Sequence, residues 1–298
     1  MLPLPDTINN LNVSNKSSKL ALTSYLGQAL SAVPFTAVKG ATSSFKYNLA
    51  GNLAAISPYS RGDTLSQSPI NTTVASEPFR SFGDMAVLDL IDILTSNTSC
   101  LTSQLTEQEY SITARILRAL NRQFIDGDGL GDNLRGIDAR ADTTIVSTLA
   151  FNINQLYQLK ESVKPASAEG LGWGANAWFS NADAFRKLLN SLQTKAVQIK
   201  WKYHSVMKVM IPFFLGMPWF IDQNILTISG RSTIYALNLD YVRILFAFSE
   251  DYPPNEKGIF RVPIPAQGAV AESGALVNLI VAIQNVPYSI AKLINVRV

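Results

Sequence analysis

The sequence predicts a mixed α+β protein in which one long amphipathic helix precedes a β-rich second half. The helix is indicated by residues 106–124, where apolar side chains recur at helical spacing. The β-rich half is indicated by β-branched and aromatic residues gathered in four segments: 198–212, 232–248, 258–264 and 275–286. Because the sequence has no repeated βαβ unit and no internal repeat, it favours segregated helices and strands over an alternating α/β fold.

The chain begins with two segments that have no sustained period. Residues 1–40 are rich in Ser, Asn and Leu and contain Lys16, Lys19 and Lys39, and we expect an arm that becomes ordered only against partners. Residues 42–80 mix short apolar alternation with glycine and proline breakers. That mixture predicts a long two-stranded excursion from the body of the protein.

The long helix has signals at both ends. Thr106 and Glu109 have the Thr-x-x-Glu spacing of a capping box, which predicts a helix start at Thr106. One apolar stripe follows, made of Ile112, Ile116, Leu117, Leu120 and Phe124, with Arg115, Arg118 and Arg122 on the opposite side. The Asp-Gly-Asp-Gly sequence at 126–129 predicts the turn that ends the helix, since glycine permits positive φ.

Three further features divide the middle of the chain. Residues 140–163 have strand-like content at 143–146 and then a helical stretch, and residues 165–174 form a Gly/Ala/Ser hinge that we take as a subdomain boundary. Ser180 is the predicted cap of a second helix over 181–192. Its expected apolar face contains Phe185, Leu188, Leu189 and Leu192.

Composition excludes several classes of protein. Charged residues make up 16% of the chain, against roughly 25% in an average domain, so much of the surface is uncharged and can be covered by neighbouring chains. The net charge of +3 is too small for tight DNA binding by phosphate neutralisation alone. No uninterrupted run of about 18 apolar residues occurs, which argues against a membrane span. Residues 1–15 lack the pattern of a secretory signal, and a lone cysteine, Cys100, agrees with a reducing compartment.

No catalytic or metal-binding constellation is found in the sequence. His204 is the only histidine, and a lone histidine in a strand-like run is better read as structural than as the base of a Ser-His-Asp triad. One histidine and one cysteine exclude a zinc site with several such ligands. The carboxylates from Asp126 resemble the start of a calcium loop, but Leu130 and Ile137 stand where that loop needs oxygen ligands. We therefore expect no enzyme activity, metal or cofactor.

A basic segment from Arg186 to Lys208 leaves two interpretations open. Six basic residues alternate there with Trp201 and Tyr203 and with no acidic residue, a composition that can follow a nucleic-acid backbone. The alternative, which we favour, is a helix surface followed by a strand whose aromatic side chains face the core while its lysines face solvent or a neighbouring subunit.

The order of several short motifs resembles the Hong Kong 97-type capsid fold of tailed-bacteriophage major capsid proteins, whose relatives include the encapsulins. The resemblance runs from about Ser44 to the C-terminus. It is carried by Ser-Glu-Pro-Phe-Arg-Ser-Phe-Gly at 76–83, the helix at 106–124, Phe-Ile-Asp-Gly-Asp at 124–128 with Leu-Arg-Gly-Ile at 134–137, Leu-Gly-Met-Pro-Trp-Phe-Ile-Asp-Gln at 215–223, Ser-Thr-Ile-Tyr-Ala at 232–236 and Asn-Val-Pro-Tyr-Ser-Ile-Ala-Lys-Leu at 285–293.

The resemblance implies a division of the chain into four parts. These are an N-terminal arm (1–43), an extended loop (44–82), a peripheral domain (83–164 and 271–298) with its spine helix at 106–124, and an axial domain (165–270). It also implies assembly into hexamers and pentamers of an icosahedral virion shell in the host cytoplasm, around double-stranded DNA held without sequence specificity. Scaffolding, portal and decoration proteins are further partners that such a subunit can have, and a membrane is not among them.

The same resemblance suggests residues for these contacts. Arg61, Asp63, Glu77 and Arg80 are the charged groups of the extended loop that are available for ion pairs between subunits. Lys16, Lys19 and Lys39 of the arm are candidates to face the DNA phosphates. Two alternatives stay open: an encapsulin-like shell around a protein cargo, and, from another class, a β-rich hydrolase or carbohydrate-binding protein.

Overall fold

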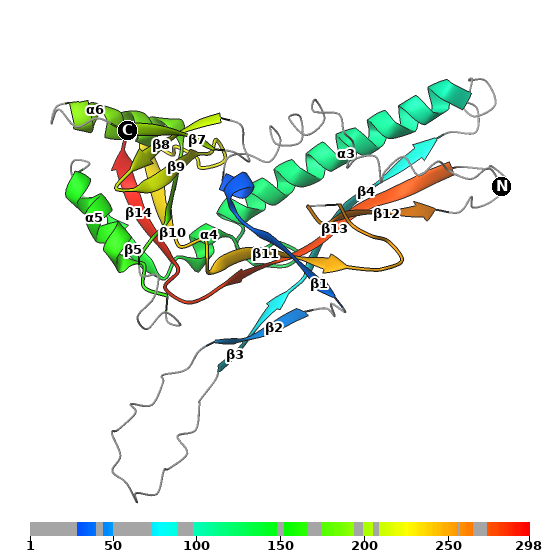
Figure 1. Cartoon of the computed structure of the whole chain (residues 1–298), viewed down its shortest axis with the longest axis horizontal. Coiled ribbons are helices and arrows are strands. Elements are labelled where there is room, and N and C mark those ends of the chain that lie inside the picture. The colour runs from blue at the N-terminus through cyan, green and yellow to red at the C-terminus, as the bar shows by residue number, and fades with distance from the viewer. Residues whose placement is uncertain are drawn as a thin grey trace, which may run out of the picture.

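The computed structural model contains a five-stranded sheet, a seven-stranded sheet and a two-stranded hairpin (Figure 1). The described residues are 29–39, 44–49, 73–88, 98–147, 152–165, 174–193, 199–204, 209–255, 257–264 and 273–298.

The first sheet has five strands, of which the central one, β13 (Ser273–Asn285), is the longest. One edge of β13 pairs with β4 (Arg80–Leu88), and its other edge pairs in turn with β12 (Ile259–Ile264) and β11 (Val242–Phe248). A fifth strand, β1 (Phe35–Lys39), runs parallel to β11. Strands β11, β12 and β13 fall in three of the four segments predicted to be β-rich, and the prediction is confirmed for them.

The long helix α3 (Thr98–Asp126) lies along β4 and β13 (Figure 1). Its predicted stripe is confirmed, because all five apolar side chains are buried in the core under the sheet, while the three arginines on the other side are exposed. The predicted start at Thr106 is wrong, since the helix begins at Thr98. Glu109 makes no capping contact there, and its carboxylate lies 3.0 Å from the guanidinium of Arg261 on β12.

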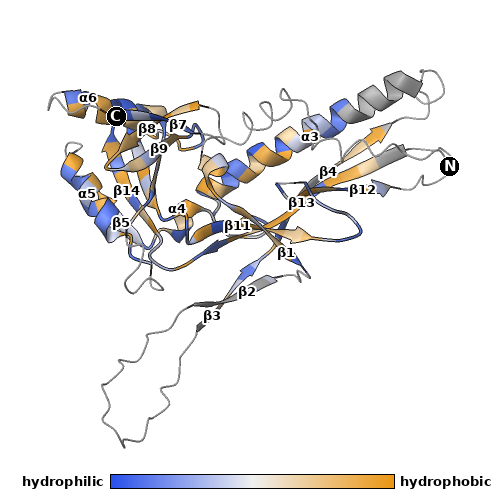
Figure 2. Ribbon diagram, viewed as in Figure 1, coloured by the Kyte–Doolittle hydropathy of each residue, from blue (hydrophilic) through white to orange (hydrophobic). Residues whose placement is uncertain are grey.

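The second sheet has seven strands in the order β5-β14-β10-β6-β9-β8-β7. These strands span Thr143–Val146, Ile290–Arg297, Arg231–Leu237, Ala177–Ser180, Met217–Ile221, Val209–Phe214 and Lys200–His204, respectively. Helices α5 (Ile153–Ser162) and α6 (Ala182–Gln193) contribute to the core on one face. Figure 2 shows apolar residues along the strands of this sheet and alternating with polar residues along both helices.

The central strands of this sheet are buried on both faces. In β6, Trp178 belongs to the core beneath α5 and α6, whereas Phe179 belongs to the core around α3, as the two-residue period of a strand requires. Trp178 stacks on Trp219 with ring centroids 5.5 Å apart, and the indole of Trp219 donates to Ser180 Oγ at 2.7 Å. The aromatic residues of β6 therefore contribute to both hydrophobic cores, one on each face of the sheet.

Helices α5 and α6 are both capped by asparagines. Asn152 and Gln155 form a capping box at the start of α5. The side chain of Asn181 accepts from the amide of Ala184 at 2.9 Å at the start of α6, whereas Ser180 is the last residue of β6. The second helix was therefore predicted at the right place, but the cap assigned to Ser180 is wrong by one residue.

The described part of the expected N-terminal arm, residues 29–39, is packed against the rest of the chain. Ala29, Leu30 and Val33 are buried in the main core, and β1 completes the first sheet. The amide of Ala29 donates at 3.2 Å to the buried carboxylate of Asp222, which also accepts from Asn121 on α3. The expectation that this segment becomes ordered only against partners is wrong for residues 29–39, and residues 1–28 and 40 lie outside the described part.

The two large sheets do not follow the expected domain boundaries at residues 165 and 270, because each sheet contains strands from both sides of them. Strands β11 and β12 belong to the sheet of β4 and β13, and strands β5 and β14 belong to the sheet of β6 to β10. The hairpin of β2 (Ser44–Leu49) and β3 (Thr73–Pro78) projects away from both sheets (Figure 1). Residues 80–82 of the expected loop already lie in β4.

Candidate functional site

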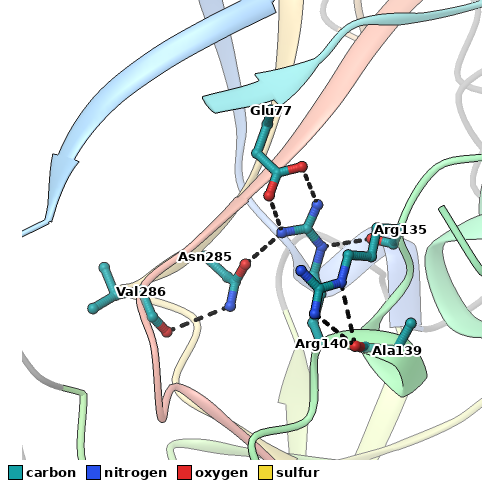
Figure 3. Close-up of polar contacts among 6 residues, drawn as sticks. All are labelled: Glu77, Arg135, Ala139, Arg140, Asn285 and Val286. Atoms are coloured by element: carbon teal, nitrogen blue, oxygen red, sulfur yellow. Dashed lines mark hydrogen bonds and ion pairs between the residues drawn. The ribbon is translucent and has the colours of Figure 1, made fainter. Parts of the chain in front are cut away.

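The root of the projecting hairpin is held to the body by an ion pair between a partly buried glutamate and a buried arginine (Figure 3). Glu77 is the last but one residue of β3, and Arg140 ends the short helix α4 (Ile137–Arg140). The guanidinium donates to both carboxylate oxygens, from Nη1 to Oε1 at 2.8 Å and from Nη2 to Oε2 at 2.7 Å. This bidentate geometry fixes direction as well as distance.

The Arg140 guanidinium also donates to two acceptors of the body. Its Nη1 donates to Oδ1 of Asn285 at the end of β13, and its Nε donates to the carbonyl oxygen of Arg135, each at 2.5 Å. The Arg140 side chain is 2% exposed and the Glu77 side chain 16%. A buried charge of this kind is tolerated only when it is paired and hydrogen-bonded. We call the group of Glu77, Arg140 and Asn285 the clamp.

The turn after α3 places the clamp arginine. The amide of Gly127 donates to the carbonyl of Gln123 at 2.9 Å, and the amide of Gly136 donates to the carbonyl of Gly127 at 2.7 Å. A Cβ atom on Gly136 would lie 2.6 Å from the carbonyl oxygen of Gln123, so only glycine allows this close return of the chain. The turn predicted at 126–129 is confirmed, and it delivers α4 to the root of the hairpin.

Carboxylates near this turn are used structurally. Asp128 accepts from the amide of Leu130 and the side-chain amide of Asn133, each at 3.0 Å, and these bonds lower the pKa of Asp128. Burial raises the pKa of Asp126, with a further rise from the nearby Asp138 charge. Within the described ranges, no group of three or more His, Cys, Asp or Glu side chains is placed to hold a metal ion.

A second polar junction links α4 to the seven-stranded sheet. The hydroxyl of Tyr235 on β10 donates to Asp138 at 2.9 Å, and the ammonium of Lys292 on β14 donates to the same carboxylate oxygen at 2.9 Å. Burial, together with the Asp138 charge, raises the pKa of Tyr235, so its hydroxyl keeps its proton and remains a donor. The segment that carries Arg140 is therefore fixed from both sides.

The structure places the expected assembly residues unequally. Glu77, expected in an ion pair between subunits, pairs with Arg140 of the same chain, whereas Arg80 on β4 faces a cavity beside the clamp. Arg61 and Asp63 lie outside the described residues.

The basic residues expected at the DNA are also distributed unequally. Lys16 and Lys19 lie outside the described residues. Lys39 forms an exposed ion pair with Glu250 at 3.1 Å and lies over the ring of Phe248.

The interpretation of the basic segment needs correction. Trp201 and Tyr203 are 50% and 60% exposed, so they do not face the core as expected. The reason is that β7 is the edge strand of its sheet, where Trp201 packs in a T-shaped arrangement with Phe185, with ring centroids 6.3 Å apart. His204, at the end of the same strand, packs edge-on against Phe220 at 6.0 Å.

The partners of Glu77 escaped the sequence analysis. Arg140 lies 63 residues from Glu77 in the sequence, and Asn285 lies 145 residues from Arg140. Nothing in the sequence around Arg140 distinguishes it from a surface arginine. The one signal is the Gly127 and Gly136 pair, which marks a close return of the backbone but not what it brings together.

Among the described residues, no helix is both long enough and apolar enough to cross a membrane. Neither a family model nor a curated protein sequence matches the chain.

Solved structures do resemble this one. The holo-SrpI encapsulin complex from Synechococcus elongatus PCC 7942 matches over 99% of this chain and 97% of the other, with 14% identity and a TM-score of 0.66. The capsid of an empty GTA particle matches over 90% of each chain, with 13% identity and a TM-score of 0.62. The capsid of cyanophage A-1(L) matches over 96% of this chain and 95% of the other, with 10% identity and a TM-score of 0.60. These likenesses cover nearly the whole chain, and they confirm the predicted Hong Kong 97-type capsid fold.

Proposed function

We propose that this chain, which has the Hong Kong 97-type capsid fold, is a structural subunit that assembles with copies of itself into a closed shell and has no catalytic role. The observation that carries the proposal is the projecting β2–β3 hairpin with its buried clamp (Figures 1 and 3). A two-stranded hairpin alone is marginally stable in water. A chain that fixes the direction of such a hairpin with a buried ion pair presents it to something, and a neighbouring copy is the surface that a shell supplies.

The finer assignment follows the capsid likenesses. We propose hexamers and pentamers of a phage head that encloses double-stranded DNA, with the body of α5, α6 and the seven-stranded sheet toward the capsomer axis. The five-stranded sheet with α3 forms the peripheral part. The low content of charged residues, 16%, supports this proposal because obligate interfaces are comparatively apolar.

An encapsulin-like shell is the second candidate. It is favoured by the likeness to the SrpI encapsulin, which has the highest TM-score of the structures named above and spans nearly all of both chains. Both candidates need the same hairpin and the same self-association. The content of purified particles separates them, because a phage head holds DNA and an encapsulin holds protein.

The hairpin can be shortened without disturbing its clamp. Lys46 pairs with Ser76 across β2 and β3, so replacing residues 47–75 with Asn-Gly closes the hairpin by a two-residue turn and keeps Glu77 in place. We expect the shortened variant to unfold with the wild-type denaturation midpoint but to form no shells in negative-stain micrographs. The matched control is the full-length chain with Arg297→Gln, an exposed change on the other sheet, which assembles normally.

Two results count against the proposal. If the wild-type chain, expressed alone or with a scaffolding protein, yields only monomers under all conditions, the shell function is refuted. If shells form normally from the shortened variant, the chain builds shells without its hairpin, and the role given to the hairpin is refuted.

A further inference from the structure

A cavity of about 210 Å³ lies against the clamp at the root of the hairpin. It is bounded by the end of β3, the start of β4 and the turn that follows α3. The polar and charged residues that line it include Ser76, Glu77, Arg80, Asp128, Arg135 and Arg140.

The clamp residues are already hydrogen-bonded within the chain. Both carboxylate oxygens of Glu77 accept from Arg140, and every nitrogen of the Arg140 guanidinium donates within the chain. Asp128 accepts from the amide of Leu130 and from the side-chain amide of Asn133, both at Oδ1. The pKa of Asp128 is lowered by these bonds, so its carboxylate stays charged at neutral pH.

The other two arginines retain donors. Arg135 donates Nε and Nη2 to the carbonyl oxygen of Ala139, at 3.3 and 3.1 Å, which leaves its Nη1. Arg80 has its Nε buried with no acceptor among the described residues. A buried guanidinium nitrogen without an acceptor is costly. Arg80 also lines the cavity, where its Nη atoms are the donors that a ligand can reach.

The charges around the cavity do not cancel. Arg80, Arg135 and Arg140 contribute three positive charges, and Glu77 and Asp128 contribute two negative charges, so the lining carries a formal surplus of one positive charge. One carboxylate would balance it. The cavity has room for a single carboxylate group with water, at about 30 Å³ per water.

We propose that this cavity binds an aspartate or glutamate side chain of a second copy of the chain, with Arg80 and Arg135 as its donors. This inference rests on the proposed shell function. In a shell, the hairpin crosses a neighbouring copy, so the neighbour comes closest to the body at the root of the hairpin, where the cavity lies. A nucleic acid fits less well, because successive phosphates would meet the charged carboxylates of Glu77 and Asp128.

The test is an Arg80→Gln variant compared with Arg297→Gln, which removes one arginine charge from an exposed position on the other sheet. Because Arg80 Nε has no acceptor among the described residues, its loss leaves the melting temperature of the unassembled subunit unchanged or raised. The concentration needed for assembly rises about tenfold or more, the effect expected for one charge-assisted contact per interface. Arg80→Lys keeps the charge and is expected to fall between wild type and Arg80→Gln. A lowered melting temperature together with wild-type assembly would show that Arg80 is only structural.

The acid is identified from a map of assembled wild-type shells. We expect a carboxylate of the adjoining copy within hydrogen-bonding distance of Arg80, and exchanging the two charges, with Arg80→Glu and the acid changed to arginine, restores assembly that Arg80→Glu alone abolishes. An empty cavity, or an isolated anion in it, overturns the proposal.

The chemistry of the cavity can be tested even if no shells form. Glutarate, added to the unassembled subunit at constant ionic strength, is expected to raise the melting temperature of wild type and not of Arg80→Gln. If inorganic phosphate stabilises the wild type more than glutarate does, or if neither has an effect, the carboxylate proposal is wrong. Failure of wild-type assembly refutes the shell function instead, so the two failures are distinguishable.

Discussion

The clamp at the root of the hairpin gives the sharpest energetic prediction. Replacing Glu77 with leucine leaves the guanidinium of Arg140 charged and buried, with only Asn285 and the Arg135 carbonyl as acceptors. Replacing Arg140 with methionine leaves the Glu77 carboxylate at 16% exposure without its cation. Each single change should cost about 3–5 kcal/mol of unfolding free energy, since breaking one half of a buried ion pair leaves an uncompensated charge.

The double variant should cost far less than the sum of the two. An apolar pair in place of a buried ion pair is often close to neutral. What remains is the loss of a donor to Asn285 and to the Arg135 carbonyl, about 1–3 kcal/mol for a buried acceptor left unpaired. The coupling energy between Glu77 and Arg140 is therefore expected to be about 3 kcal/mol or more.

Denaturant unfolding of the unassembled subunit measures this cycle. The control is the exposed pair of Arg115 and Asp84, whose 2.8 Å contact joins side chains that are 62% and 50% exposed. A cycle of Arg115→Gln and Asp84→Asn should give a coupling energy below about 1 kcal/mol. If the Glu77 and Arg140 changes are additive within about 0.5 kcal/mol, the clamp does not act as a pair and the reasoning is refuted.

Three further predictions concern the core and its connections. Every hydrogen bond of the Asp222 carboxylate is one that it accepts, so in Asp222→Asn the new amide group faces other donors. This change should lower the unfolding free energy by about 1–3 kcal/mol, a loss that calorimetry would detect. Gly127→Ala brings a Cβ against backbone oxygens and should cost about 1–3 kcal/mol of unfolding free energy by denaturant titration, more than Gly131→Ala, where φ is +55° but no atom lies within 4 Å; equal costs would contradict the steric argument. Burial raises the pKa of Glu109 above 4.5, against the opposing effect of the Arg261 charge, so the native state keeps a proton that the unfolded chain has lost. The stability of wild type, measured relative to Glu109→Gln, should therefore fall as pH rises from 4.5 through the raised pKa, and a pH-independent difference between the two would show that Glu109 does not titrate in this way.

The sequence by itself determined the parts of the structure that depend on local periodicity. The stripe of α3 from Ile112 to Phe124 follows from apolar residues at helical spacing, and burial of every member confirms it. The end of α3 at Asp126 was likewise predicted from the glycine-containing sequence that follows it. Both predicted helix caps were wrong, because Thr106 has a capping-box spacing in the middle of a helix, and because Ser180 and Asn181 are adjacent residues that are both good caps.

Only the tertiary structure decided which polar groups meet and which aromatic side chains are covered. Trp178 and Trp201 have the same chemistry, but Trp178 is buried on a central strand between two layers, whereas Trp201 lies on an edge strand and is 50% exposed. Glu77 looked available to a neighbour until the fold placed Arg140 against it. Periodicity is a property of a few consecutive residues, whereas an ion pair between residues 63 positions apart depends on how the whole intervening backbone folds. The sequence therefore specified the α+β fold and its projecting hairpin, and the folded chain fixed which charged groups are paired within the chain.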